Sequence, residues 1–404
     1  MIPRSVNIWW GPPRKFAKLI EERRISWLEL FYDLVYVIVI SKATHRLAAH
    51  PGWDGLGDYL YLFVMIFWGW ANGSLYHDLH GSPGIRTRFM TLWQMMAVAA
   101  LAVTLDSPPE HLIFRGTIAL AVLQGFITYL WWSVGIYDKL HRKLNFPYTL
   151  CYIGALISMI ATLYVPPPFQ RVLFGITLVL NFLPPFLGVR RFQANSNDFS
   201  LSRSMMERLG LLTIIVFGEA ILGVIGGTGK LPFVNTEVWI SFGFGILVVF
   251  SLWWIFFALV ADRENKQGFI KGQCLLLLFL PTLASLGMTG ASFPGVMAGL
   301  MPEETHTSLV SRFLFGAGVT VFLWSISTIS LFLEYPPAYH QAKRVLQPLL
   351  LIAGALIMLI TIGMLHMDVI WFLVGIFLVL FTIIFVIMRG WYKVELKQLE
   401  EQAE

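Results

Sequence analysis

The sequence contains few charged residues. Asp, Glu, Lys and Arg make up 13% of the chain, whereas 57% of its residues are hydrophobic; ordinary soluble domains contain about 25% charged residues. The mean hydropathy is +0.69. This composition excludes an ordinary soluble protein and predicts an all-α, polytopic integral membrane protein surrounded by membrane lipids. The formal net charge is +5, and it gives no indication of nucleic-acid binding.

Cysteines and catalytic motifs are also scarce. The chain has 2 cysteines, and Cys151 and Cys274 lie far apart in apolar runs, which predicts packing residues rather than a disulfide framework or a metal site. No HExxH motif, nucleophile elbow or His/Cys cluster occurs. Residues 226–230 (GGTGK) resemble a phosphate-binding loop only superficially, because they lack the first glycine and follow a helix. We therefore expect no enzyme activity, no cofactor and no bound metal.

Long apolar stretches, in contrast, recur along the whole chain. Each is close to the length of about 20 residues that an α-helix needs to cross a bilayer. Proline or glycine clusters separate several of them. The sequence therefore predicts twelve transmembrane helices, at residues 27–47, 55–77, 87–105, 112–134, 146–165, 171–189, 205–227, 236–261, 270–292, 310–333, 345–365 and 368–388.

The distribution of basic residues predicts the orientation of these helices. Of the 29 Lys and Arg residues, all but seven fall in the two termini or in alternate loops. Cytoplasmic segments of membrane proteins are enriched in Lys and Arg. We therefore expect both termini in the cytoplasm and a multi-pass protein in the cell inner membrane.

The same layout predicts five segments along the chain. Residues 1–26 form a basic cytoplasmic N-terminus, of which 14–26 is either an amphipathic helix on the membrane surface or a solvated tail. Two six-helix membrane halves follow at 27–189 and 205–389. A cytoplasmic linker at 190–204 joins them, and residues 390–404 form a cytoplasmic tail.

The two halves are predicted to be parallel repeats. Trp70 and Asp78 close the second apolar stretch with the same spacing as Trp254 and Asp262 close the eighth. Six helices in each half would give equivalent helices the same orientation, as in transporters built from parallel repeats.

Charged residues within apolar stretches are the candidate functional residues, because each costs about 2.5–3.5 kcal/mol inside a membrane helix. Glu29 and Asp33 lie four residues apart on one face of the first predicted helix, and Tyr36 continues that face. Two carboxylates in a low-dielectric site resist double ionisation. The pair is therefore predicted to share a proton and to bind a proton or a cation. The alternative is that Arg208 neutralises both and the cluster only fixes packing.

Glu207, Glu219 and Lys42 complete the candidate ion-binding residues. Glu207 opens the seventh predicted helix as Glu29 opens the first. Glu219 lies on the order of 18 Å deeper along that helix, among glycines that permit close helix contact or a local break in the helix. The repeat aligns Glu219 with position 41, so we expect Lys42 to pair with Glu219. The competing expectation is that Lys42 extends to the membrane surface and Glu219 is protonated.

Two segments resemble the signatures of a known family. Residues 29–37 (ELFYDLVYV) resemble the opening signature of the bacterial low temperature requirement protein A family, and residues 207–219 (ERLGLLTIIVFGE) resemble its second signature. The resemblance covers essentially the whole chain. It implies a polytopic membrane protein named for growth in the cold, without an agreed substrate. Residues 31–33 (FYD) are also similar to the Phe-Ser-Asp motif of the endolysosomal potassium channel family, although Tyr32 replaces the serine and the second half has no such motif.

Three functions remain open from the sequence. The first is a proton- or cation-coupled transporter of a small solute or cation that uses the intramembrane carboxylates. The second is a cation channel lined by the first and seventh helices. The third is a non-transporting protein that organises the membrane or handles lipids, with its acids paired to bases. Flux that depends on protonation would favour the first function, and silence in every flux assay the third.

Overall fold

The computed structural model describes residues 13, 25–81, 84–138, 142–187, 201–232, 235–261, 263–301 and 305–403. Within these ranges the regular secondary structure is helical, apart from one isolated antiparallel bridge between Asn265 and Leu333. The prediction of an all-α protein is confirmed.

Twelve long helices are described, and each overlaps one predicted apolar stretch. They are α2 (Trp27–Ala49), α3 (Trp53–His80), α4 (Ile85–Leu105), α5 (Pro109–Tyr137), α6 (Arg142–Thr162), α7 (Pro167–Phe182), α9 (Arg203–Gly229), α10 (Thr236–Leu259), α11 (Phe269–Ala298), α12 (Thr305–Phe332), α13 (His340–Gly363) and α14 (Val369–Ala403).

Nine of the described helices are long and apolar enough to cross a membrane. Helices α2, α3 and α7 are not among them. Helix α7 has only 16 residues, and α2 carries acidic and basic residues along its length. A polytopic membrane protein is therefore supported, and the count of twelve spans stays a prediction.

The described helices belong to two compact units. Unit 1 takes its residues from Met1–Ala43, Tyr61–Arg208 and Gln267–Gln273, and unit 2 from Thr44–Leu60, Leu209–Lys266 and Cys274–Glu404. Helices α2, α3, α9 and α11 therefore each contribute residues to both units.

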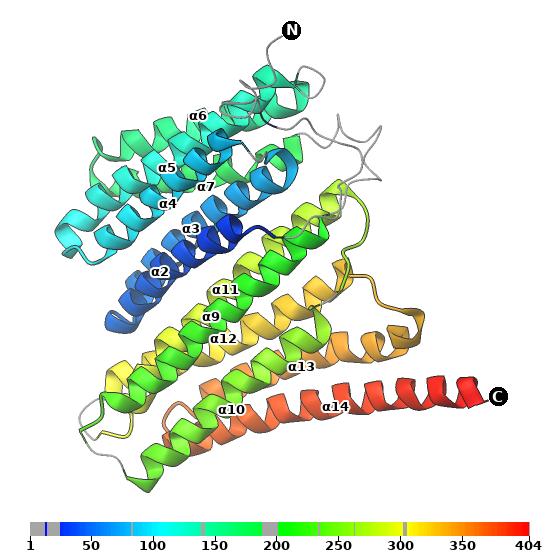
Figure 1. Cartoon of the computed structure of the whole chain (residues 1–404). Helices are drawn as coiled ribbons and strands as arrows, with labels where there is room; N and C mark the ends of the chain where they lie inside the picture. Colours follow the sequence, from blue (N-terminus) through cyan, green and yellow to red (C-terminus); the bar gives the residue numbers. More distant parts are fainter. Residues whose placement is uncertain are drawn as a thin grey trace. The chain divides into compact units, whose positions relative to one another are not determined.

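In unit 1, consecutive helices pack against one another, α4 on α5, α5 on α6 and α6 on α7 (Figure 1). Buried amides link these helices. Gln124 and Asn181 exchange two side-chain hydrogen bonds of 2.9 and 3.2 Å, and the Trp68 indole donates to the Asn181 carbonyl at 3.0 Å. Polar pairs of this kind hold membrane helices together where the hydrophobic effect between helices is weak.

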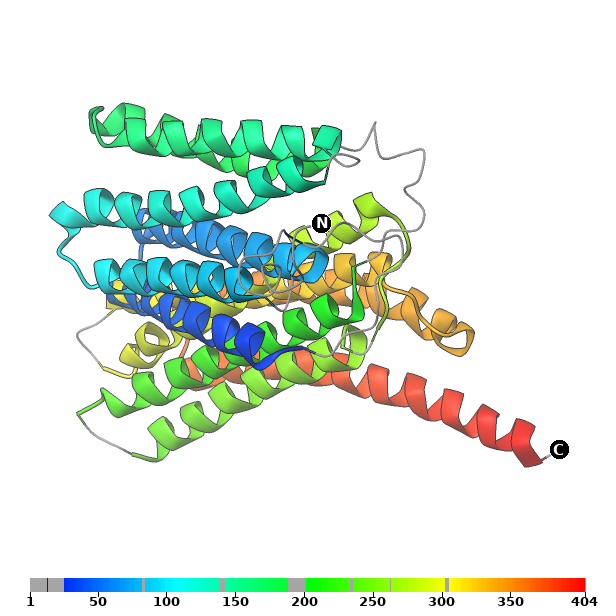
Figure 2. The ribbon, with the colours of Figure 1, turned by 45° about the horizontal axis from the view of Figure 1, so that its top comes forward.

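In unit 2, α12 packs on α13, α13 on α14, and α14 on α10, as Figures 1 and 2 show from two directions. Glycines bring α9 and α11 into close contact. A Cβ atom on Gly223 would overlap the Gly290 carbonyl, and one on Gly227 would crowd Pro294. The predicted close contact at these glycines is thus confirmed. The alternative of a broken helix is wrong, because α9 is continuous from Arg203 to Gly229.

Several predicted features fall outside the described residues. These are most of the N-terminal segment 14–26, most of the linker 190–204, and Asp262 of the proposed Trp–Asp repeat. The internal repeat, the five-segment layout and the cytoplasmic termini therefore stay predictions.

Candidate functional site

The first turn of α2 places Glu29. Its Oε2 atom accepts hydrogen bonds from the Ser26 backbone N–H at 2.9 Å and from the Ser26 hydroxyl at 2.8 Å. The Ser26 Oγ atom in turn lies 3.4 Å from the Glu29 backbone nitrogen. This reciprocal arrangement is a capping box, which satisfies backbone N–H groups that a helix start would otherwise leave without partners. Glu29 therefore fixes the start of α2.

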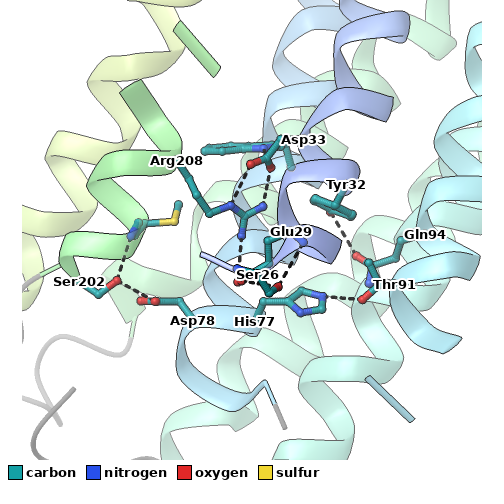
Figure 3. Close-up of polar contacts among 12 residues, drawn as sticks. Ser26, Glu29, Tyr32, Asp33, His77, Asp78, Thr91, Gln94, Ser202 and Arg208 are labelled. Carbon is teal, nitrogen blue, oxygen red and sulfur yellow. Dashed lines mark hydrogen bonds and ion pairs between the residues drawn. The ribbon is translucent and has the colours of Figure 1, made fainter. Parts of the chain in front are cut away.

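One turn further, Asp33 binds Arg208 of α9 (Figure 3). The Arg208 Nε atom donates to Oδ2 of Asp33 at 3.0 Å and Nη2 donates to Oδ1 at 2.5 Å. The Trp70 indole donates to Oδ1 at 2.7 Å. Both charged side chains are only 1% exposed. A buried, bidentate and charge-assisted pair of this kind fixes the geometry of both partners.

Arg208 also faces the second carboxylate. Its Nη1 atom lies 3.6 Å from Oε1 of Glu29, which is 3% exposed. The guanidinium carbon is 5.8 Å from the ring centres of both Tyr32 and Trp70, one ring from each of α2 and α3. Two acids and one base thus lie in one aromatic enclosure, which we call the acid–arginine cluster (Glu29, Asp33 and Arg208).

The contacts of Arg208 bear on the two interpretations of Glu29 and Asp33 that the sequence left open. Arg208 contacts both carboxylates, as the packing alternative required. A buried cation offsets most of the cost of placing two acids out of water, and removing it would leave charges unpaired. The sharing of a proton between Glu29 and Asp33 stays a prediction.

A chain of buried hydroxyl, amide and imidazole groups continues from this cluster. The Tyr32 hydroxyl lies 3.1 Å from the Tyr36 hydroxyl and 3.3 Å from Oε1 of Gln94. On α3 and α4, His77 and Thr91 share a hydrogen bond of 2.9 Å. Figure 3 shows Tyr32, His77, Thr91 and Gln94 beside the acid–arginine cluster. Tyr36 contacts this chain through Tyr32, and its predicted role in ion binding stays a prediction.

Asp78 completes the polar groups at this end of α3. Its Oδ1 atom accepts a hydrogen bond of 2.7 Å from the Ser202 hydroxyl, and the Ser202 Oγ atom accepts from the Met205 backbone N–H at 3.0 Å. Ser202 therefore caps α9 and ties it to Asp78 less than two turns before Arg208. This contact helps to place the guanidinium.

Glu219 lies separately, in the unit 2 part of α9. Its side chain is 6% exposed, and its Oε2 atom has no hydrogen-bond partner among the described residues. Its neighbour Ala220 lies at the close contact with Gly290 of α11. This oxygen is therefore an acceptor site that no group among the described residues fills.

Two predicted residues have other surroundings. Glu207 is exposed, in contrast to its buried neighbour Arg208. Lys42 forms an ion pair with Asp106, with Nζ 2.6 Å from Oδ2 and side chains 39% and 60% exposed. Its ammonium group extends to an acid at the end of α4, as the competing expectation held, and the predicted pair with Glu219 has no support.

Sequence reasoning missed three contributors to the site. Ser26 could have been found, because Ser-x-x-Glu before an apolar run is the signature of a capping box. The sequence pattern marked Trp70 only by its spacing from Asp78, and no pattern indicated a role for Gln94. Their roles depend on which helices pack together, which periodicity within one helix does not reveal.

No metal site is apparent in the part of the chain that the structure describes. Three or more His, Cys, Asp or Glu side chains do not gather there as metal ligands would. Cys151 and Cys274 are free.

Comparison with known families agrees with both signatures. Residues 24–386 match the family described as bacterial low temperature requirement A protein (LtrA). The chain belongs to this family. No curated protein matches the sequence. The LtrA match includes α2 with Glu29 and Asp33 and α9 with Arg208 and Glu219.

Proposed function

We propose that this LtrA protein is a proton- or cation-coupled transporter of the cell inner membrane. In this proposal Glu219 carries the proton or cation that is exchanged during transport. The observation that supports it most is the burial of the Glu219 carboxyl, with Oε2 lacking a hydrogen-bond partner within the described ranges.

The chemical reason is the free acceptor site of this carboxyl group. A carboxyl oxygen that no described hydrogen-bond donor contacts can accept a hydrogen bond or bind a cation. Ionisable residues within membrane helices are accordingly found in proton relays and ion pathways.

The acid–arginine cluster has a different part in this proposal. Arg208 already contacts both carboxylates, and Trp70 fills another acceptor site of Asp33. This paired cluster holds the first turns of α9 against α2 and α3 rather than exchanging ions. Glu29, Asp33 and Arg208 are thus positioning residues.

The pairing of Glu29 and Asp33 with Arg208 also favours a second candidate function. A non-transporting protein that organises the membrane needs its buried acids paired to bases, and Glu29 and Asp33 meet that requirement. Glu219 is not paired to a base in this way, because its Oε2 atom lacks a hydrogen-bond partner among the described residues. The first candidate accounts for Glu219 and is preferred for that reason.

Flux measurements in liposomes test the proposal. The purified protein would be reconstituted with a pH-sensitive dye inside, and gradients of K⁺, Na⁺ or H⁺ would be imposed. We expect proton-linked flux that Glu219→Gln abolishes. Glu207→Gln is the matched control, because it removes an exposed acid from the same helix. Flux in both variants equal to that of the unmodified protein would exclude Glu219 as the carrier, and no flux in any condition would favour the second candidate.

A further inference from the structure

A cleft opens in unit 2 where α10 ends and α13 begins. It is partly open to its surroundings and is lined by residues of α10, α12, α13 and α14 and of the segments next to them. None of the candidate site residues lines it. Its polar groups belong to segments that the charge distribution places on the cytoplasmic side.

Backbone pairing holds the rim of this cleft in place. The Lys266 N–H donates to the Phe332 carbonyl and the Glu334 N–H donates to the Glu264 carbonyl, both at 2.8 Å. The hydroxyl of Tyr335 donates to the Leu259 carbonyl at 2.6 Å. Burial raises the pKa of Tyr335 to about 12, against the opposing effect of the Arg263 guanidinium. The ring is therefore neutral and fixed in the wall.

Two cations face this ring. The Arg263 guanidinium carbon lies 5.2 Å from the ring centre of Tyr335 and 5.4 Å from that of Tyr339, and the Lys343 ammonium nitrogen lies 4.6 Å from the Tyr335 ring centre. The Arg263 Nε atom is buried and has no hydrogen-bond partner among the described residues. Neither cation forms an ion pair with a carboxylate among the described residues; the nearby Glu264 and Glu334 are exposed.

These contacts favour an anion in the cleft. Two like charges beside one ring repel each other, and an anion between them would remove the repulsion. A phosphate would also accept a hydrogen bond from the Arg263 N–H that now has no partner.

Apart from Ser330 and Gln347, which hydrogen-bond to each other at 2.7 Å, the rest of the wall is apolar or aromatic. Leu346, Leu350 and Trp391 line it, and the Trp391 ring meets Tyr339 edge to face with centres 6.4 Å apart. Trp and Tyr concentrate where membrane meets water. An anionic group beside such a wall fits an amphiphile, whereas a free anion would use only the polar half of the cleft.

We propose that this cleft binds an anionic membrane phospholipid. Arg263 and Lys343 contact its phosphate, and Leu346 and Trp391 line the first part of an acyl chain. Basic pockets between membrane helices bind phospholipid headgroups in this manner.

Lipid binding to the full-length protein in detergent tests the proposal. Fluorescent phosphatidylglycerol, fluorescent phosphatidylcholine and inorganic phosphate as a competitor would be compared. We expect the first lipid to bind most tightly. Arg263→Gln and Lys343→Gln should each weaken its binding about fivefold, from roughly 1 kcal/mol per cation near a membrane surface. Arg344→Gln is the matched control, because it removes a neighbouring exposed charge that does not line the cleft.

A second type of variant reduces the space in the cleft without removing a charge. Ala342 lines the cleft, so Ala342→Phe should fill it and lower binding while both cations remain. If a charge variant fails to fold, Ala342→Phe decides the matter. Three results would overturn the proposal. The first is equally tight binding of phosphatidylglycerol and phosphatidylcholine, and the second is inorganic phosphate that displaces phosphatidylglycerol as well as unlabelled phosphatidylglycerol does. The third is an Arg344→Gln variant that weakens binding as much as Arg263→Gln or Lys343→Gln.

Discussion

Arg208 is the residue on which the polar interior of unit 1 depends. One guanidinium contacts two buried carboxylates and lies beside the rings of Tyr32 and Trp70. The two acids are almost fully shielded from water. Water therefore cannot replace Arg208 as their partner unless the helices move apart.

Replacing this arginine should be costly. We expect Arg208→Gln to lower the free energy of unfolding by about 3–5 kcal/mol, the usual cost of removing one partner of a buried ion pair. Thermal unfolding of the purified protein in detergent would measure it. Arg203→Gln, an exposed arginine of the same helix, should have little effect.

A compensating change sharpens this test. In the Arg208→Gln background, Asp33→Asn removes the carboxylate that bound the lost guanidinium most closely. We expect it to restore part of the stability, because a neutral amide is cheaper to bury than an unpaired charge. Equal stability of Arg208→Gln and the unmodified protein would show that the ion pair contributes little.

At the scale of elements, the contact between α9 and α11 depends on the absence of side chains. A methyl group at Gly223 would overlap the Gly290 carbonyl, whereas nothing lies within 4 Å of the same position on Gly226. We expect Gly223→Ala to destabilise the protein by about 1–3 kcal/mol through overpacking. Gly226→Ala should be neutral or slightly stabilising, because alanine favours helix. Thermal unfolding of the two variants would test this prediction. A Gly223→Ala variant at least as stable as Gly226→Ala would contradict it.

The amide pair between α5 and α7 gives a second prediction at this scale. Gln124 and Asn181 exchange two side-chain hydrogen bonds. A double-mutant cycle with Gln124→Leu and Asn181→Leu should give a coupling of about 0.6–1.7 kcal/mol, the range found between membrane helices. A coupling near zero would mean that the two amides contribute independently.

The helices themselves could be predicted far better than their contacts. Apolar length and turn residues located every long helix, because both are properties of the local sequence. The ends were less well predicted: α14 continues to Ala403, beyond the predicted end at 388, and α7 ends at Phe182, before the predicted end at 189. The partner of Lys42 could not be found in this way. The repeat suggested Glu219, but Asp106 lies at the end of α4 and is within reach of a long exposed side chain.

At the scale of the whole molecule, the orientation in the membrane remains to be measured. In a background with Cys151→Ala and Cys274→Ala, a single cysteine at Lys230 should react with an impermeant reagent from outside intact cells. One at Arg142 should react only after the cells are permeabilised. Both positions are exposed. Labelling of position 142 from outside would contradict the predicted topology.

The distance along the chain between Asp33 and Arg208 has a consequence for biosynthesis. Arg208 follows Asp33 by 175 residues, and at a synthesis rate of about 5–20 residues per second it emerges roughly 9–35 s later. Helix α2 is therefore synthesised before its counter-ion exists. Unit 1 also includes Gln267–Gln273, so its folding ends only when much of the second half has been made. Ribosomes that stall before Arg208 would leave a first helix whose acids lack that partner, and such nascent chains should be preferred substrates for membrane proteases.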